Sequence, residues 1–381
     1  MEIYLVGGAV RDRLLGLPVG ERDWVVVGAS PQDMLEQGFK QVGKDFPVFL
    51  HPETKDEYAL ARTERKTGHG YKGFAFHTSA DVTLEQDLRR RDLTINAMAE
   101  APDGTLIDPY HGQQDLGAGL LRHVSPAFAE DPVRILRVAR FAAQFGKWGF
   151  KVAHSTNTLM QKMVGNGEID HLVAERVWAE LAKALATDSP ERFFTVLRGC
   201  HALAVLFPEI DREYADEGQS HKDEPGIAAL DALQASVSRS EDPRLRFSVL
   251  TQALGHDLTQ EQRARQAETL CKRLHSPNDY AQLALTAIKL EQNAGSDRPE
   301  DILDLMESSG AFKPGGRWRL LLSVYQAADL IDQSRADQLI EVSVNAAGVN
   351  AAQLENLNLQ GPALGAAIRS KRLEIIRNTL G

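Results

Sequence analysis

The hydrophobic periodicity of this chain changes once along its 381 residues. Up to about residue 107, β-prone runs at 4–6, 24–27 and 58–61 alternate with helical stretches at 10–15 and 31–37. From about residue 125, helical periodicity continues to the end of the sequence. The pattern predicts an α+β fold in which a mixed head precedes an all-helical remainder.

Length and polar stretches suggest the domain boundaries. A chain of 381 residues predicts two or three domains. Helix starts are predicted at Asp131-Pro132, at Ala174-Glu175 and at residues 189–191. The acidic, aperiodic stretch 212–226 is the best linker candidate, and 293–300 is a second one.

Composition narrows the class of protein and its compartment. The formal net charge of -10 argues against a protein that coats polyanions generally, although local arginine clusters allow a confined RNA contact. Only two cysteines, Cys200 and Cys271, are present, which fits a reducing cytoplasm. No apolar run approaches the roughly 18 residues that span a bilayer. We therefore expect a cytoplasmic protein without a membrane contact.

A glycine pair, Gly7-Gly8, follows the first β-prone run and precedes a predicted helix. Glycines at such a position let backbone amides approach a triphosphate, and a helix N-terminus favours an anion. Considered alone, the pair is explained at least as well by a plain tight turn.

Two carboxylates, Glu21 and Asp23, stand at positions i and i+2 at the start of an apolar strand. Side chains so spaced point to the same side of a strand. Their charges repel unless cations lie between them, which is the arrangement that two-metal phosphoryl chemistry requires. For an isolated pair of this kind, a solvated turn is the favoured alternative.

These features occur together in one run, GGAVRDRLLGLPVGERDWVVVG, which begins at Gly7. Further motifs follow in order: RRDLTINAMA at 90–99, LIDPYHG at 106–112, EDPVRILRVARF at 130–141 and ERVWAEL at 175–181. Together they resemble the polymerase β nucleotidyltransferase superfamily, and within it the class II bacterial CCA-adding enzymes and their poly(A) polymerase relatives. The resemblance is dense over residues 1 to about 210 and is closest to the gammaproteobacterial type.

The resemblance implies a role for three carboxylates. Asp23 matches a metal-binding aspartate, Glu21 occupies its partner's position, and Glu57 matches a third catalytic carboxylate. The family normally has aspartate at both of the first two positions. Because Mg²⁺ demands near-ideal octahedral geometry, the longer side chain of Glu21 puts one metal site in doubt. For Glu57, an exposed strand charge is an equal alternative.

The resemblance also implies which residues hold the incoming nucleotide. Gly8 and Arg11 match groups that bind the triphosphate, and Arg91 matches a nucleotide contact. Arg137 and Arg140 continue a basic stripe along the helix of the EDPVR motif, where they are expected to help hold the nucleotide. On an unrelated helix the same stripe is a solvated face.

The motif Glu130-Asp131-Pro132-Val133-Arg134 resembles the base reader of class II enzymes. Cytosine and adenine both present an exocyclic amine beside a ring-nitrogen acceptor, so Asp131 can accept from the amine while Arg134 donates to the ring. Uracil and guanine present the opposite pattern, and unpaired buried polar groups support discrimination on the order of 10⁴-fold. Asp131 before a proline is also an ordinary N-cap, and both roles can coexist.

The implied architecture is a nucleotidyltransferase head at 1–107, a helical neck at 108–185 that recognises the base, and a helical body and tail at 186–381. The implied enzyme is a monomer or homodimer. It adds and repairs the 3′-terminal CCA of tRNA from CTP and ATP without a nucleic-acid template. Mg²⁺ is its expected cofactor, and the body and tail are expected to hold the acceptor and T arms of tRNA.

The basic segment 62–72 resembles a mobile loop of enzymes that complete the terminal A, and a plain surface loop is its alternative.

Other functions share some of these features. A partial enzyme that adds only CC or only A belongs to the same class. A poly(A) polymerase would need a strongly basic extension, whereas this chain is acidic and ends in IRSKRLEIIRNTLG. Glu21 suggests a catalytically weakened tRNA-binding protein, but the other motifs are intact.

Relatives of the gammaproteobacterial type carry a metal-dependent HD phosphohydrolase domain after the neck. In the corresponding run, which begins at Arg246-Phe247, the expected His-Asp pair falls on Gln252-Ala253. The pair His256-Asp257 lies four residues later, and the span 222–273 contains no other histidine. A site for a transition metal needs three or more converging side chains, so the HD region at about 222–273 is predicted to be degenerate.

We therefore predict that the protein lacks phosphatase and cyclic phosphodiesterase activity. Purified protein incubated with Ni²⁺ should not turn over p-nitrophenyl phosphate or 2′,3′-cyclic nucleotides. Turnover that disappears in a His256→Ala variant would show that a metal site exists after all.

Overall fold

The computed structural model describes residues 1–381 except 43–47, 67–73, 79, 217–226, 350–359 and 381, and it leaves out the side chains of 64–79. Contacts divide the described chain into two units. The first comprises Met1–Glu180 and Arg192–Val205, and the second comprises Leu181–Glu191 and Leu206–Gly381. The predicted head boundary at residue 107 lies inside the first unit, so the division into head, neck, body and tail stays a prediction.

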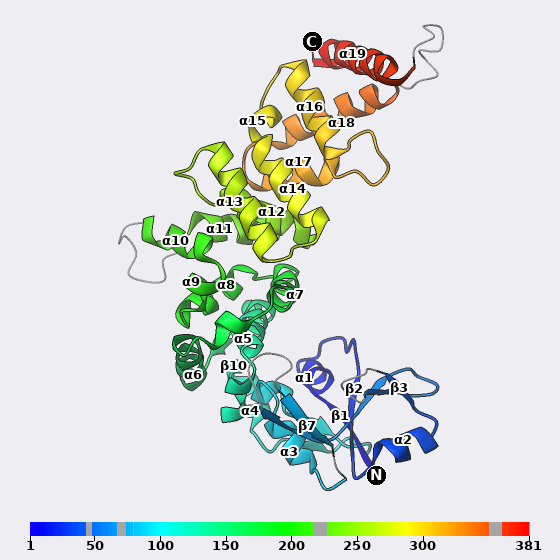
Figure 1. Cartoon of the computed structure of the whole chain (residues 1–381), viewed down its shortest axis with the longest axis vertical. Helices are drawn as coiled ribbons and strands as arrows, with labels where there is room; N and C mark the ends of the chain where they lie inside the picture. The colour runs from blue at the N-terminus through cyan, green and yellow to red at the C-terminus, as the bar shows by residue number, and fades with distance from the viewer. Residues whose placement is uncertain (43–47, 67–73, 79, 217–226, 350–359, 381) are drawn as a thin grey trace. The chain divides into compact units, whose positions relative to one another are not determined.

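The first unit is built on a mixed sheet with the strand order β3-β4-β5-β2-β1-β8-β9 (Figure 1). Strand β2 is central, because it pairs antiparallel with β1 and parallel with β5. Two small sheets, β6-β7 and β10-β11, accompany it. The strands are β1 Glu2–Val6, β2 Asp23–Val27, β3 Lys40–Val42, β4 Val48–Leu50, β5 Glu57–Leu60, β6 Arg62–Lys66, β7 Phe74–Thr78, β8 Ala99–Glu100, β9 Leu106–Ile107, β10 Leu120–Leu121 and β11 Lys151–Val152.

Strand β2 has a core on each face of the sheet, which explains its continuous apolar run. Successive strand side chains point to opposite faces. Val25 packs in a cluster with Leu84 and Leu88 of the α3 helix, and Val26 packs in another cluster with Met34 of the α2 helix. Strand β2 begins at Asp23, which pairs with Val6 of β1 and with Glu57 of β5.

Short helices connect and cover the sheet. Ser30 and Asp33 form a capping box at the start of α2, with Pro31 in its first turn. Thr83 and Gln86 form another capping box at α3. The elements are α1 Gly8–Leu14, α2 Pro31–Glu36, α3 Leu84–Arg89 and the 3-10 turn η1 Thr94–Asn96.

The remainder of the first unit is mostly helical, as the periodicity predicts. Helix α5 buries one face along its whole length, including Ile135, Leu136, Ala139 and Ala142. The other elements are α4 Gly112–Ala118, η2 Pro126–Glu130, α5 Val133–Gln144, η3 Gly146–Trp148, α6 His154–Gly165, η4 Glu168–His171, α7 Ala174–Leu185, α8 Glu191–Gly199 and α9 Ala202–Leu206. Helix α7 begins in the first unit and ends in the second.

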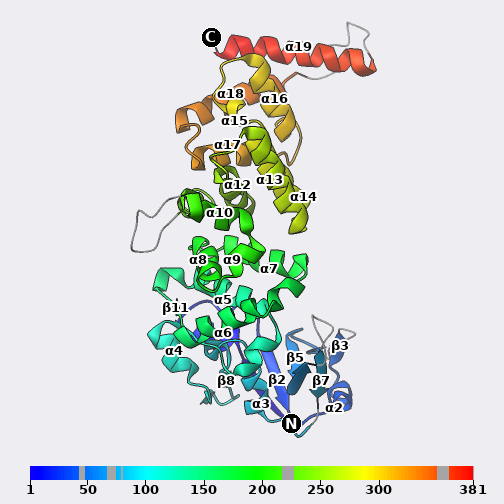
Figure 2. The ribbon, with the colours of Figure 1, turned by 60° about the vertical axis from the view of Figure 1, so that its left-hand side comes forward.

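The second unit is helical and is organised around α12, whose residues 245–252 are all buried. Apolar side chains from α12, α14, α16, α17 and α18 share one core cluster. Its helices, coloured green to red in Figure 2, are α10 Pro208–Asp216, α11 Ala228–Ser236, α12 Pro243–Ala253, α13 Gln260–Arg273, α14 Asn278–Lys289, α15 Glu291–Ala294, α16 Pro299–Ser309, α17 Trp318–Ala327, α18 Gln333–Ala347 and α19 Gly361–Leu380.

The structure corrects both linker predictions and one loop prediction. Residues 212–216 belong to α10, where the side chain of Glu213 is buried and accepts from the amide of Gly255 at 3.0 Å. Residues 217–226 lie outside the described residues. The second candidate shrinks to the connection 295–298 between α15 and α16. Residues 62–66, predicted as part of a loop, pair with β7 as strand β6, and 67–72 lie outside the described residues.

The pair His256-Asp257 follows the end of α12 rather than continuing it. Gly255 has a positive φ of 72°, which turns the chain away from the helix. The His256 side chain is 66% exposed, and its Nδ1 lies 3.5 Å from the Glu213 carboxylate. In the described parts of the chain, no group of three or more His, Cys, Asp or Glu side chains is gathered for a metal.

None of the helices described here combines the length and apolar character needed to cross a bilayer.

The second unit contains a buried guanidinium whose loss should be costly. Arg246 is 2% exposed and donates to the carbonyls of Leu185 at 2.7 Å, Thr187 at 2.6 Å and Ser240 at 3.0 Å. Replacing it with methionine keeps most of the volume but leaves these buried acceptors unpaired. Arg246→Met should lower the free energy of unfolding by about 3 kcal/mol in urea titrations. The exposed Arg265→Met should leave the midpoint unchanged, and equal effects would contradict this account.

Candidate functional site

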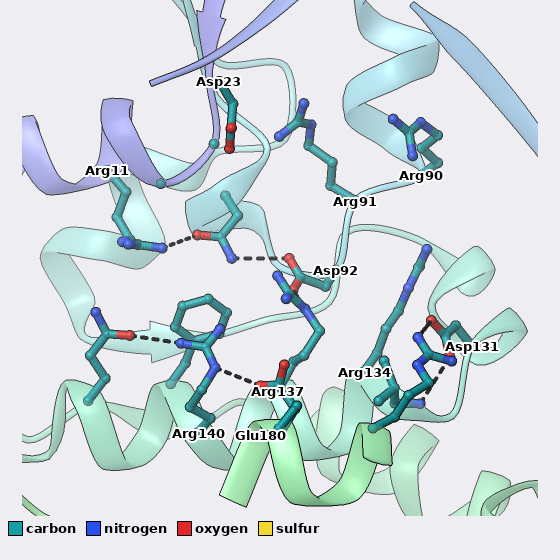
Figure 3. A pocket seen from close by; sticks show the side chains of 18 of the residues that line it. Arg11, Asp23, Arg90, Arg91, Asp92, Asp131, Arg134, Arg137, Arg140 and Glu180 are labelled. Atoms are coloured by element: carbon teal, nitrogen blue, oxygen red, sulfur yellow. Dashed lines mark hydrogen bonds and ion pairs between the residues drawn. The ribbon is translucent and has the colours of Figure 1, made fainter. Parts of the chain in front are cut away.

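A cavity of about 730 Å³ opens within the first unit, between the edge of the sheet and the helices α5 and α7 (Figure 3). Its volume lies in the range of ordinary small-molecule sites. Basic side chains outnumber acidic ones on its wall, which favours a polyanionic ligand. The charged lining residues are Arg11, Arg62, Arg90, Arg91, Arg134, Arg137, Arg140, Arg176, Glu21, Asp23, Asp92, Asp131 and Glu180.

The glycine pair lies at the sheet end of this cavity. Gly7 has a φ of 70°, and a Cβ there would come within 2.8 Å of an Arg91 guanidinium nitrogen. Gly8 lines the cavity, and a Cβ there would lie 3.4 Å from the Arg11 guanidinium. The positive φ at Gly7 favours glycine, because a side chain there would strain the backbone, whereas the Arg91 guanidinium at the end of a flexible side chain could move aside.

Glu21 and Asp23 line the same end of the cavity, at the point where β2 begins. Partial burial raises the pKa of Asp23, the charge of Arg91 opposes that rise and the charge of Glu21 adds to it. A partly desolvated carboxylate beside a second carboxylate is stabilised by a cation. Two carboxylates facing space for a polyphosphate are also the usual protein donors to Mg²⁺, so the residues present fit such an ion.

Glu57 stands next to Asp23, because the parallel pairing of β2 and β5 puts these two residues in register. Its side chain is exposed and is not among the residues that line the cavity. The structure therefore brings Glu57 to the same sheet edge, while the third-carboxylate role stays a prediction.

A chain of hydrogen bonds crosses the floor of the cavity. Arg11 Nη1 donates to the Asn96 side-chain oxygen at 2.5 Å, and Asn96 Nδ2 donates to Asp92 Oδ1 at 3.0 Å. Arg137 Nε donates to Asp92 Oδ2 at 2.6 Å. Figure 3 shows Arg11, Asp92 and Arg137 close to one another on the wall of the cavity. Arg11 also lies over the rings of Phe141 and Phe145 at 5.2 and 5.1 Å.

Asp92 is the centre of this row. Burial by itself would raise its pKa, but the charge of Arg137 and hydrogen bonds from Asn96, Arg137 and the Leu93 amide hold the pKa well below its usual range. Asp92 is therefore a permanent anion at neutral pH. The same pair raises the pKa of Arg137. Arg11, predicted to bind the triphosphate, and Arg137, predicted to help hold the nucleotide, are thus joined by one hydrogen-bonded network.

Arg91 and its neighbour Arg90 share the buried carboxylate of Asp87. Arg90 Nη2 lies 2.9 Å from Asp87 Oδ1, and Arg91 Nη2 lies 3.3 Å from Oδ2. Burial opposes ionisation of Asp87, yet the two arginine charges lower its pKa. Asp87 therefore orients Arg91, whose guanidinium lies beside Gly7. Figure 3 shows that Arg91 also points toward Asp23.

The EDPVR segment lies at the other end of the cavity. Helix α5 begins at Val133, one residue later than the predicted start, and Asp131 Oδ1 accepts from the Val133 amide at 3.1 Å. Arg134 is buried, and its Nη1 donates to the Ala127 carbonyl at 3.0 Å. Both side chains line the cavity. The N-cap of α5 is Pro132 rather than Asp131, so the predicted N-cap role of Asp131 is wrong, although its carboxylate still accepts from the first amide of the helix.

Arg140 is held at several points on the same wall. Its Nε donates to Glu180 at 2.6 Å and its Nη1 to Gln144 at 3.0 Å, while the guanidinium lies 4.0 Å from the centre of the Phe141 ring. Burial lowers the pKa of Arg140, and Glu180 opposes the effect. Such fixation leaves little side-chain freedom to lose when an anion binds.

Sequence reasoning missed several lining residues, above all Arg176 and Glu180 on α7. Both belong to the ERVWAEL motif, which had no assigned role. Their spacing of four residues on a helix, beside a nucleotide motif, was the available signal. Nothing in the sequence indicates which side chains of α5 they meet.

Two family matches cover parts of the chain. Residues 3–122 match the poly A polymerase head domain, and residues 149–214 match a probable RNA- and SrmB-binding site of polymerase A.

Relatives match along nearly the whole chain. A multifunctional CCA protein of Methylococcus capsulatus is 49% identical over 402 residues, covering 99% of this chain and 95% of the relative. One from Dechloromonas aromatica is 54% identical over 339 residues, covering 84% and 82%.

Solved structures share the fold. A Bacillus stearothermophilus CCA-adding enzyme in complex with CTP has a TM-score of 0.66 at 22% identity, covering 99% of this chain and 89% of that chain. A CCA-adding enzyme with ATP has a TM-score of 0.64 at 19% identity, covering 98% and 86%.

Proposed function

The chain belongs to the family of CCA-adding tRNA nucleotidyltransferases, the multifunctional CCA proteins, and from that premise we propose how its own residues act. The tRNA 3′-hydroxyl attacks the α-phosphate of CTP or ATP, and pyrophosphate leaves. The observation that carries this proposal is the single cavity, which combines a carboxylate pair at one end with the Asp131–Arg134 pair at the other. A nucleoside triphosphate needs both ends.

The sheet end is proposed to hold the phosphates and the ion. Members of nucleotidyltransferase families use divalent metals, and Glu21 with Asp23 would hold Mg²⁺ here. When bound there, Mg²⁺ lowers the pKa of the attacking hydroxyl and offsets charge on the departing phosphates. Arg11 and Arg91, each anchored by a neighbouring side chain, orient the triphosphate oxygens.

The helical end is proposed to select the base. Asp131 accepts from the amine of cytosine or adenine, and Arg134 donates to the ring nitrogen. Arg137 and Arg140 are already fixed by Asp92 and Glu180, so they add contacts to the nucleotide at little entropic cost. Selection without a nucleic-acid template then depends on protein side chains alone.

We further propose that tRNA is bound through its acceptor and T arms by the region 186–381, and that the enzyme is a monomer or homodimer. The match of residues 149–214 to a probable RNA-binding site supports RNA contact in the neighbouring helices. A cytoplasmic location is supported by Cys200 and Cys271, which are free and buried.

The metal proposal predicts unequal effects for changes at Asp23 and Glu21, and a change at Glu57 distinguishes its two possible roles. Asp23→Ala should reduce turnover by about 10³-fold or more, because a ligand common to both ions is lost. Glu21→Asp should keep or raise activity, since it restores the family's pair. Glu57→Gln should be severe if Glu57 is catalytic and nearly silent if it is an exposed strand charge. Steady-state CTP incorporation with varied Mg²⁺ measures all three.

Retention of more than a trace of activity in Asp23→Ala would refute the metal assignment. If the wild-type protein is inactive and Glu21→Asp restores turnover, the chain is a decayed enzyme.

The base-selection proposal predicts that one substitution lowers activity with CTP and with ATP to a similar extent. Arg134→Ala should lower kcat/KM for CTP and ATP alike by about 10- to 100-fold, because one charged donor serves both bases. Arg122→Ala, which removes an arginine paired with Asp115 away from the cavity, is the matched control. tRNA transcripts ending before C, CC or CCA provide the substrates, with each labelled NTP. Extension by long tracts of A alone would replace this function with poly(A) polymerisation.

A further inference from the structure

Helix α7 presents Arg176 and Glu180 to the cavity, one helical turn apart. Each contacts a different residue of the opposite wall. Arg176 pairs with Asp131 at the start of α5, and Glu180 pairs with Arg140 farther along that helix. Figure 3 shows the contact between Glu180 and Arg140.

The contact of Arg176 with Asp131 uses both carboxylate oxygens. Arg176 Nη1 donates to Oδ1 at 3.1 Å, and Nη2 donates to Oδ2 at 2.7 Å. Oδ1 also accepts from the Val133 amide at 3.1 Å. A two-point pair of this kind fixes the plane of the carboxylate as well as its position.

This arrangement leaves one hydrogen-bond acceptor position of the Asp131 carboxylate unused. An ionised carboxylate offers about four acceptor positions and no donor. Three are used by Arg176 and Val133, so the remaining position is on Oδ2. An exocyclic amine can fill that position, whereas a base carbonyl there would face a second acceptor with no hydrogen between them.

We propose that Arg176 is a positioning residue for base selection, which locks the Asp131 carboxylate so that one acceptor position faces the incoming base. The inference rests on the proposed function, because it assumes that Asp131 reads the amine. Without Arg176, the carboxylate is held only by Val133 and can rotate about its side-chain torsions. A rotated carboxylate still binds a nucleotide loosely but no longer discriminates by the direction of its lone pair.

Glu180 provides the matched comparison on the same helix. It orients Arg140, which contacts the nucleotide without reading its base in the proposed function. Glu180→Gln should therefore raise the KM for CTP and ATP together and leave the choice among bases unchanged. A general weakening of α7 would make Arg176 and Glu180 variants alike.

The test uses the full-length protein with tRNA transcripts lacking CCA, and measures kcat and KM for CTP and UTP. Arg176→Ala should lower the CTP/UTP ratio of kcat/KM by about tenfold or more, mainly through KM, because it removes two charge-assisted hydrogen bonds from the reader. Arg176→Lys keeps the charge but loses the planar two-point contact, so it should restore only part of the selectivity.

A double variant shows whether Arg176 acts through Asp131. In an Asp131→Ala background, adding Arg176→Ala should cause no further loss of CTP/UTP selectivity. The proposal is overturned if the two losses multiply, or if Arg176→Ala and Arg176→Lys both slow CTP and UTP equally. A wild-type protein that adds neither C nor A would instead overturn the proposed function itself.

Discussion

The ion pair between the buried Asp92 and the partly exposed Arg137 is the interaction on which the site depends. It joins the segment between α3 and η1 to the middle of α5, two parts of the chain that are 45 residues apart. Taking the Asp92 charge out of water is expensive, and only good geometry with further hydrogen bonds offsets the cost. Asn96 and the Leu93 amide supply those bonds, and Asn96 extends the network to Arg11. One network therefore spaces the proposed triphosphate end of the cavity from the proposed base end.

The many arginine side chains on the cavity wall repel one another, and acceptors close to each guanidinium offset this repulsion. Nearby acceptors neutralise or bind these arginines. Asp87 pairs with Arg90 and Arg91, Asp92 with Arg137, Asp131 with Arg176 and Glu180 with Arg140, and the Ala127 carbonyl accepts from Arg134. These partners fix the guanidinium groups before a ligand arrives. A triphosphate then meets donors that need not reorganise, which is the condition for strong electrostatic stabilisation of charge developing in a reaction.

Sequence patterns predicted those features of the structure that depend on residues near one another in the chain. The apolar run 24–27 is a central strand because Val25 and Val26 face separate cores, and the carboxylates before it consequently stand at the sheet edge. The spacing of Asp131, Arg134 and Arg137 placed all three on one cavity wall. Partners distant in sequence could not be predicted in this way. Glu213 made residues 212–216 look like a polar linker, yet its carboxylate is buried against the Gly255 amide. Likewise, Arg176 and Glu180 acquire their roles only from what α7 packs against.

In the proposed function, side chains of a single cavity choose cytosine and adenine without a nucleic-acid template. The most direct measurement is to incubate the purified protein with Mg²⁺, all four NTPs and a tRNA that ends at its discriminator base, and to sequence the 3′ ends formed. The account predicts that the ends read CCA and stop there. Ends that contain uridine or guanosine at comparable frequency would contradict it.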